Sequence, residues 1–396
     1  MKKNGIAPNR VWICMVLMLV AVFSASAQER IAFKMLGKAD SKAEAIPSIN
    51  LVVMSENKKS LALGGLANII REKAYGMQIG GLYNHFGMGG GLAVGGLLNT
   101  TSGSYHGIQV GGLANIVREK TYGIQIGGLY NHSGMGGGLT VGGLLNTTSG
   151  SYYGIQVGGL GNVTKDAVGV QVGGLFNVAR KFYGIQIAGV MNVAQDIYGF
   201  QLAGVTNVAK DVRGLQLAGV ANIAKEVKGV QFAAILNVAE ESDFPIGLVN
   251  IIGNGDMGVA LTYDMLGNSM VAFRSGGKYT YGILGVGYNQ CLAERVVAET
   301  GYGLRLPLCR GLQVNNELKA TAPINTSSAN FSYLLAPSLT LWKHFNLFGG
   351  PSLNFLMADT AEATNLLPKH ALWNKRPGEG ARSLYIGYQV GVQYIF

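Results

Sequence analysis

Gly184-Ile-Gln-Ile-Ala-Gly-Val-Met-Asn192 and Gly199-Phe-Gln-Leu-Ala-Gly-Val-Thr-Asn207 are the two clearest copies of a unit that recurs about a dozen times between Leu61 and Asp243. The pitch is 15 or 16 residues, and a short charged connector follows most copies. A fixed period of this length indicates that the region is built from one repeated structural element.

One asparagine marks each repeat, and a glutamine stands six residues before it in nine of them. Ala62, Ala93 and Thr140 occupy the glutamine position in the other three repeats. We treat the two amide rows as the structural residues of the repeat. The asparagines are Asn68, Asn84, Asn99, Asn115, Asn131, Asn146, Asn162, Asn177, Asn192, Asn207, Asn222 and Asn237; the glutamines are Gln78, Gln109, Gln125, Gln156, Gln171, Gln186, Gln201, Gln216 and Gln231.

The residues of each repeat alternate in character. Gln186, Ala188, Val190 and Asn192 fall on one face, and the intervening positions are apolar and interchangeable. Alternation over about ten residues rich in β-branched side chains predicts an extended strand. Every charged residue between Leu61 and Asp243 lies three to six positions after a repeat asparagine. We therefore expect the charge to be confined to turns.

Strands of a transmembrane β-barrel have these features: roughly 9 to 11 residues, an apolar outer face, aromatic rims and polar turns. We therefore predict an all-β fold, a transmembrane barrel of about twenty strands built largely from the repeats. The amide rows would line its lumen, and Gln would face Asn across antiparallel neighbours. Tyrosines just before the strand glycine would lie at the membrane boundary; they are Tyr75, Tyr122, Tyr153, Tyr183 and Tyr198.

A β-solenoid is the alternative fold, followed by a smaller C-terminal barrel of about eight strands. The strict period favours it, and the amides would then form internal ladders. A 47-residue super-unit also favours it, because the near-identical turns at residues 71–73 and 118–120 would lie at opposite ends of a barrel. Against it, a solenoid in water should be polar outside, whereas Tyr83, Leu98 and Phe176 stand at an outward position.

The first 27 residues resemble a secretory signal, with a basic start, an apolar run from Val11 to Phe23 and the small residues Ala25-Ser26-Ala27. Its removal leaves 28 basic and 21 acidic residues, a formal charge of +7 without a basic patch. We expect no nucleic-acid partner. Residues 28–47 form a polar lead-in, residues 48–257 the repeat region and residues 258–396 the C-terminal barrel strands.

The C-terminal region carries longer alternating strands that end in an aromatic residue. Counted back from Phe396, one face of the last strand holds Tyr394, Val392 and Val390, and the other holds Gln393 and Gln389. A terminal aromatic on such a strand resembles the signal by which outer-membrane barrels are assembled, so Tyr394 and Phe396 are our candidate assembly signal. The expected strands are 259–265, 270–274, 279–288, 296–308, 312–320, 331–342, 345–357 and 384–396.

These motifs carry a family resemblance. The repeats G-[ILVF]-Q-[ILVF]-[GA]-G-[LV]-x-N, the exit Phe244-Pro-Ile-Gly-Leu-Val-Asn250 and the later Gly350-Pro-Ser-Leu-Asn-Phe355 resemble a bacterial surface-repeat protein family of Gram-negative bacteria. The resemblance implies an outer-membrane or cell-surface location. It implies no activity and no functional residues.

Catalytic, cofactor and metal sites have no clear candidates in this sequence. His85 and His132 occupy the same position of duplicated repeats, and no His, Cys, Asp or Glu cluster has metal-ligand spacing. We expect neither an enzyme nor a cofactor. After signal cleavage Cys291 and Cys309 remain, and they could form a disulfide in an exported protein.

The function we expect is that of an outer-membrane surface protein, either a passive, weakly selective pore or a structural component. The alternative is a surface-exposed solenoid scaffold for binding or adhesion, held by a C-terminal membrane barrel. The expected partners are outer-membrane lipid and the barrel-assembly machinery, and the sequence identifies no ligand.

Overall fold

The structure is a computed structural model that describes residues 32–33, 37–38, 45, 47–292, 296–324, 328–358, 370–375 and 380–396. The predicted signal at residues 1–27 and almost all of the lead-in lie outside the described residues. Within the described chain, no helix is long and apolar enough to cross a membrane. The chain divides into an N-terminal unit, Met1–Ser133, and a C-terminal unit, Gly134–Phe396.

The N-terminal unit is a stack of parallel strands in which each repeat pairs with the next. Asn68 pairs with Asn84, and Gly107 pairs with Gly123. Two short strands, β1 and β2, pair in parallel with β3. The strands are β1 (Ala32–Phe33), β2 (Gly37–Lys38), β3 (Ser48–Lys58), β4 (Ala62–Ala74), β5 (Met77–Gly80), β6 (Tyr83–Gly95), β7 (Leu98–Thr101), β8 (Tyr105–Gly111) and β9 (Ala114–Gly127); β10 (Tyr130–Gly142) spans the boundary between the units.

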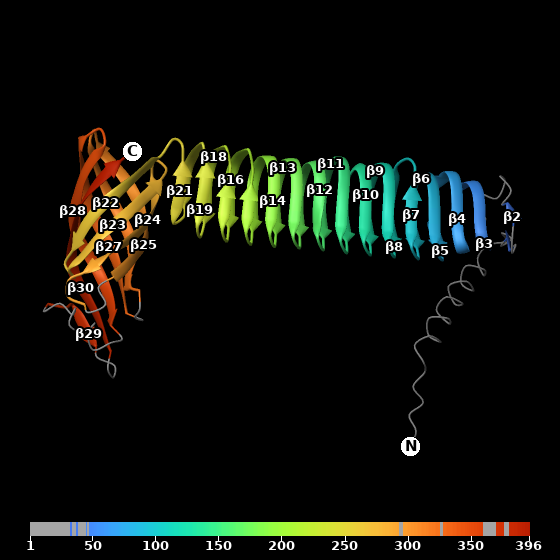
Figure 1. Cartoon of the computed structure of the whole chain (residues 1–396). Coiled ribbons are helices and arrows are strands. Elements are labelled where there is room, and N and C mark those ends of the chain that lie inside the picture. The colour runs from blue at the N-terminus through green and yellow to red at the C-terminus, as the bar shows by residue number, and fades with distance from the viewer. Residues whose placement is uncertain are drawn as a thin grey trace, which may run out of the picture. The chain divides into compact units, whose positions relative to one another are not determined.

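The repeats of the C-terminal unit are also turns of a parallel β-solenoid, drawn in green to yellow in Figure 1. Asn177 pairs with Asn192, and Gln186 pairs with Gln201. The strands are β11 (Leu145–Gly158), β12 (Gly161–Gly173), β13 (Phe176–Ala188), β14 (Met191–Ala203), β15 (Thr206–Val208), β16 (Asp211–Ala218), β17 (Ala221–Ile223), β18 (Glu226–Ala233), β19 (Leu236–Ala239), β20 (Glu241–Ile246) and β21 (Val249–Ile252).

The prediction of a twenty-strand transmembrane barrel is therefore wrong, and so is the expected facing of Gln against Asn. Equivalent positions of successive repeats lie side by side, because a constant period wound in one direction places them next to each other. Most amides therefore lie beside their own copy, whereas Gln78 lies between Ala62 and Ala93. The predicted extended conformation of the repeats is confirmed. The alternative of a solenoid followed by a smaller barrel is the observed architecture.

One turn of the solenoid has three straight stretches, as β14 and the residues after it illustrate. Asn192, Ala194, Ile197, Gln201 and Ala203 are buried, and runs of two or three consecutive outward residues separate them into three groups. The runs of outward residues mark the corners. The expected inward position of Val190 is therefore wrong, because that residue occupies a corner and is 43% exposed.

The charged connectors are not reversals between antiparallel strands, as the barrel hypothesis required. Lys181 pairs with Asp196 in parallel register, within the continuous strands β13 and β14. The charged residues thus form the third stretch of each turn and remain in the sheet.

A glycine forms one corner because its backbone has a positive φ. Gly199 has φ 139°, and a Cβ there would lie 2.2 Å from the carbonyl oxygen of Gly184 in the preceding turn. Only glycine combines this backbone conformation with so close an approach. The glycine that opens the repeat motif is therefore a geometric requirement of the turn.

The rest of the C-terminal unit is a closed antiparallel barrel of eight strands. Strand β22 pairs with β23 on one side and with β30 on the other, which closes the ring drawn in gold to red in Figure 1. The eight strands expected from the sequence correspond to these, and β29 (Trp373–Lys375) adds a short pairing with β30. The barrel strands are β22 (Asp256–Asp264), β23 (Asn268–Gly276), β24 (Thr280–Asn289), β25 (Val296–Cys309), β26 (Leu312–Pro323), β27 (Ala329–Trp342), β28 (Phe345–Ala358) and β30 (Ala381–Ile395).

The last solenoid turn packs against the outside of the barrel wall. The hydroxyl of Thr280 donates to the carbonyl oxygen of Pro245 at 2.6 Å, and Asn250 Nδ2 donates to the carbonyl oxygen of Ser275 at 3.1 Å. A Cβ on Gly282 would lie 2.1 Å from the carbonyl oxygen of Gly247. A glycine at this point of β24 is what allows the two backbones to approach.

Candidate functional site

The asparagine row is a continuous hydrogen-bonded ladder inside the C-terminal solenoid. Asn192 Nδ2 donates to Asn207 Oδ1 at 2.9 Å and to the carbonyl oxygen of Leu202 at 2.8 Å. The first bond links neighbouring turns, and the second ties together two stretches of one turn. The row runs from Asn146 to Asn250, with donor–acceptor distances of 2.8–3.0 Å.

The N-terminal unit contains the same ladder. Asn68, Asn84, Asn99 and Asn115 each donate to the asparagine of the following repeat at 2.7–2.8 Å, as far as Asn131. The side chains are 0–1% exposed. These hydrogen bonds are made within the stack, so the amides of successive repeats serve as one another's partners. Asn68 Oδ1, at the start of the row, has no partner among the described residues.

The glutamine row forms a second ladder with the opposite direction of donation. Gln201 Nε2 donates to Gln186 Oε1 at 2.9 Å, towards the N-terminus, whereas the asparagines donate towards the C-terminus. In the C-terminal unit the row continues from Gln156 to Gln231 at 2.8–3.0 Å. In the N-terminal unit, Gln125 donates to Gln109 at 3.0 Å, whereas Gln78 lies between Ala62 and Ala93 and donates to the carbonyl oxygens of Ser60 and Tyr75. Most of the predicted amides are thus brought together in internal ladders and not around a lumen.

Two of the repeats that lack the glutamine contain a buried tyrosine instead. Thr140 Oγ1 lies 2.8 Å from the hydroxyl of Tyr152, whose pKa burial raises to about 12. In the other unit, Ala93 belongs to the same core cluster as Tyr105, which stacks on Phe86 with ring centroids 6.0 Å apart. The small residue leaves volume that the ring fills. The 47-residue spacing of both pairs is the sequence signal for this exchange.

The charged stretch of the solenoid neutralises itself. Arg180 binds Asp166 through two hydrogen bonds of 3.0 and 2.6 Å, which lower the pKa of the Asp166 carboxyl. Lys228 lies 2.8 Å from Glu226. These pairs are substantially exposed, so each contributes little to stability. Within the described residues no set of three or more His, Cys, Asp or Glu side chains is placed to hold a metal ion.

The barrel interior holds a buried charge network that the sequence analysis missed. Arg274 Nη1 lies 3.0 Å from Glu317 Oε1, and both side chains are at most 1% exposed. Tyr281 donates to the same carboxylate oxygen at 2.6 Å, and Lys319 Nζ lies 3.0 Å from Glu299 Oε2. Two cations and two anions balance, which makes their burial tolerable. These charged residues occupy the inward positions of strands in which polar and apolar residues alternate. That alternation is the sequence signal that could have placed them inside the barrel.

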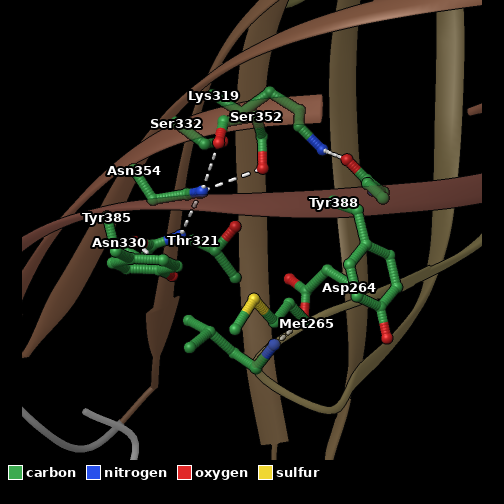
Figure 2. Close-up of a pocket in the computed structure, with 12 residues that line it drawn as sticks. Asp264, Met265, Lys319, Thr321, Asn330, Ser332, Ser352, Asn354, Tyr385 and Tyr388 are labelled. Atoms are coloured by element: carbon green, nitrogen blue, oxygen red, sulfur yellow. Dashed lines mark hydrogen bonds between the residues drawn. The ribbon is translucent and has the colours of Figure 1, made fainter. Parts of the chain in front are cut away.

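A second polar region of the interior is almost completely filled. In Figure 2, Asn354 points towards Ser352 and Asn330, with Nδ2 donating to Ser352 Oγ at 2.8 Å. Lys319 also donates to Gln389 there. The cavity has a volume of about 10 Å³, room for roughly one water molecule. The interior therefore forms a packed polar core at this level.

The other predicted residues lie at the surface of the barrel or of the solenoid. Tyr394 packs beside Phe345 and Phe396, with ring centroids 5.1 and 6.0 Å apart, and both predicted assembly residues are exposed. Cys291 and Cys309 are free, exposed thiols and form no disulfide in this structure. His85 and His132 face outward and stack on Tyr83 and Tyr130 respectively.

Comparison with known proteins adds no relative to this geometry. No family model, no curated protein and no solved structure matches the chain.

Proposed function

We propose that this protein is a surface scaffold of the outer membrane, in which the C-terminal barrel is the membrane anchor and the solenoid carries the binding or adhesive surface. The observation that carries the proposal is the polarity of the barrel: charged and amide side chains fill its interior and aliphatic side chains cover its wall. A water-soluble barrel has the opposite arrangement.

The outer wall presents a continuous row of paired aliphatic residues across six neighbouring strands. Leu261 pairs with Val271 and Val392, and the row continues through pairings on both sides. All six side chains are between 46% and 55% exposed. They are Val286, Val271, Leu261, Val392, Leu347 and Leu339. Strands of 9–15 residues are long enough to cross a bilayer.

An aromatic cluster supports the same orientation. Trp342, Phe345, Tyr394 and Phe396 gather at one end of the barrel, where consecutive ring centroids are 5.1–6.1 Å apart. Aromatic side chains are favoured at the boundary between hydrocarbon and water. The filled interior argues against a passive pore through this barrel, so the proposal assigns it the role of an anchor.

The test is fractionation of Gram-negative cells that express the full chain. We expect the protein to sediment with outer membranes and to resist extraction by alkaline carbonate. Leu261→Arg combined with Val392→Arg should abolish retention, whereas Leu372→Arg, at a leucine 62% exposed outside the barrel strands, should not. Release of the unaltered chain by carbonate would contradict the proposal without reference to any variant.

A further inference from the structure

An apolar edge runs along the solenoid of the C-terminal unit. Each turn contributes the second residue of the corner that precedes its asparagine, and these side chains are 40–51% exposed. With parallel neighbours roughly 4.8 Å apart, seven turns give an edge about 29 Å long. The residues are Leu144, Leu160, Leu175, Val190, Val205, Val220 and Ile235.

The two stretches that meet at this edge are also apolar on their outer faces. Ile185 and Ile187 face outward on one side of the corner, and Met191 and Val193 do so on the other. Charged residues are confined to the remaining stretch, where Asp196 pairs in register with Asp211. The edge and its two apolar sides form one continuous apolar wedge, and a contiguous exposed apolar surface marks a site of contact with protein, ligand or membrane.

We infer that this wedge is immersed in a lipid bilayer, with the charged stretch of each turn facing water; the inference rests on the proposed membrane anchoring. One flat protein partner would cover one side of the wedge, whereas lipid covers both sides and the edge together. The division of each turn into one charged and two apolar stretches is that of an interfacial element lying in the plane of a membrane.

Tyrosines lie at the boundary between the charged and apolar stretches, as this orientation requires. Tyr183 and Tyr198 stack with ring centroids 4.5 Å apart, and Arg213 in the next turn lies over the Tyr198 ring at 5.3 Å. Tyrosine has an apolar body and a polar tip, which suit the level of lipid headgroups.

The backbone of the wedge can tolerate hydrocarbon. Turns such as β13 and β14 pair along almost their whole length, so the backbone N–H and C=O groups bond to neighbouring turns and not to solvent. In the last turn, Gly247 and Leu248 contact Gly282 on the same outer wall that we propose to face lipid. The C-terminal end of the solenoid therefore adjoins a surface that is in contact with the bilayer.

The test is a spin-label accessibility measurement on the full chain in phosphatidylcholine/phosphatidylglycerol vesicles, with Cys14, Cys291 and Cys309 replaced by serine. Labels are placed singly at Val205 on the edge, Asp211 on the charged stretch and Val271 on the barrel wall. We expect oxygen to reach the Val205 and Val271 labels and a water-soluble nickel complex to be excluded from them. The Asp211 label should behave in the opposite way.

The other outcomes are distinguishable. Nickel access at Val205 with exclusion at Val271 would overturn the inference and leave the anchoring intact. Protection of Val205 from both reagents would overturn it by showing that protein, such as a second copy of the chain, covers the edge. Nickel access at Val271 would overturn the proposed anchoring, and the inference with it.

A set of substitutions provides an independent readout. Val190→Glu, Val205→Glu and Val220→Glu together should expose a label at Leu175 to the nickel complex, because carboxylates are excluded from hydrocarbon. The matched control places three glutamates on the charged stretch of the corresponding turns: Gln195→Glu, Lys210→Glu and Lys225→Glu. It should leave that label protected, and an equal response to both sets would contradict the inference.

Discussion

Replacing one rung of the asparagine ladder should destabilise several turns of the solenoid. In Asn192→Leu, Asn207 Oδ1 loses its donor at 2.9 Å and Asn177 Nδ2 loses its acceptor at 3.0 Å, both at buried positions. The second N–H of Asn177 keeps its bond to the Ile187 carbonyl oxygen at 2.7 Å. A buried oxygen or N–H that loses its hydrogen bond costs about 1–3 kcal/mol, which gives about 2–6 kcal/mol for the Asn207 oxygen and one Asn177 N–H. Leucine retains the side-chain volume approximately, so the polar contribution dominates.

The assay is hydrogen–deuterium exchange of the full chain, read on peptides from β13 to β16. Exchange of the protected amides should accelerate by roughly 30-fold to 10⁴-fold, since each tenfold corresponds to about 1.4 kcal/mol. The control is Val193→Ala, an outward residue of the same strand, for which we expect a cost below about 1 kcal/mol. Equal exchange in the two variants would refute the ladder as a source of stability.

Three further predictions concern the first turn, the barrel interior and the cysteines. Burial lowers the pKa of Lys58, which donates to Ser48 Oγ at 2.8 Å, to about 8. The unfolded chain holds this proton up to the ordinary lysine pKa of about 10.5, so the stability of the first turns should rise by about 3 kcal/mol from pH 8 to 10.5. In Lys58→Met, the stability measured by hydrogen exchange should no longer depend on pH in this range. Arg274→Met should cost about 3–5 kcal/mol of barrel stability, because it leaves the Glu317 carboxylate without its main cation. Adding Glu317→Met should restore much of that loss, as measured by the temperature at which the barrel denatures on gels. A double variant no more stable than the single one would contradict this. Cys291 and Cys309 should both react with a bulky maleimide in the folded protein, and labelling that requires prior reduction would show that they are bridged.

The sequence predicted the strands of this protein well and the topology of its repeats poorly. Alternation of apolar and polar residues correctly indicated extended conformation in the repeats and eight strands after Asp256. It also assigned the faces of the last strand correctly, with Gln389 and Gln393 buried and Val390 exposed. These properties depend only on the two-residue period of a strand.

Topology depended on contacts that no local pattern contains. Both antiparallel and parallel pairing can bury Gln186 and Asn192, so their alternation did not decide between barrel and solenoid. The observed pairing of each residue with its copy 15 positions away, such as Gly184 with Gly199, follows from the constant period. The corner at Val190 was missed because strict alternation leaves no place for consecutive outward residues.

The candidate site was predicted as residues but not as an arrangement. The amide rows are ladders because residues such as Asn192 and Gln186 meet their own copies in the next turn, a contact between residues distant in sequence. The Arg274–Glu317 pair joins strands β23 and β26, 43 residues apart in sequence, so no spacing motif could reveal it. In one repeat Thr140 stands in place of the glutamine, and the ring of Tyr152 fills the space. In the sequence these two residues were visible only as separate departures from the repeat.

The same inverted polarity appears in both folds of the C-terminal unit. The solenoid buries Gln201 and exposes Leu202, and the barrel buries Gln393 while exposing Val392. An alternation of this kind reports the surroundings of a strand, polar on one face and apolar on the other, and is independent of how strands pair. A barrel was inferred from the repeats because barrels are the common strand architecture with an apolar exterior.

A solenoid whose amides satisfy one another internally can also have an apolar exterior, since its turns leave few backbone groups unpaired along its sides. The apolar exterior that argued against a solenoid in water therefore remains a property to be explained, and lipid contact along the edge formed by residues such as Val205 explains it without changing the fold.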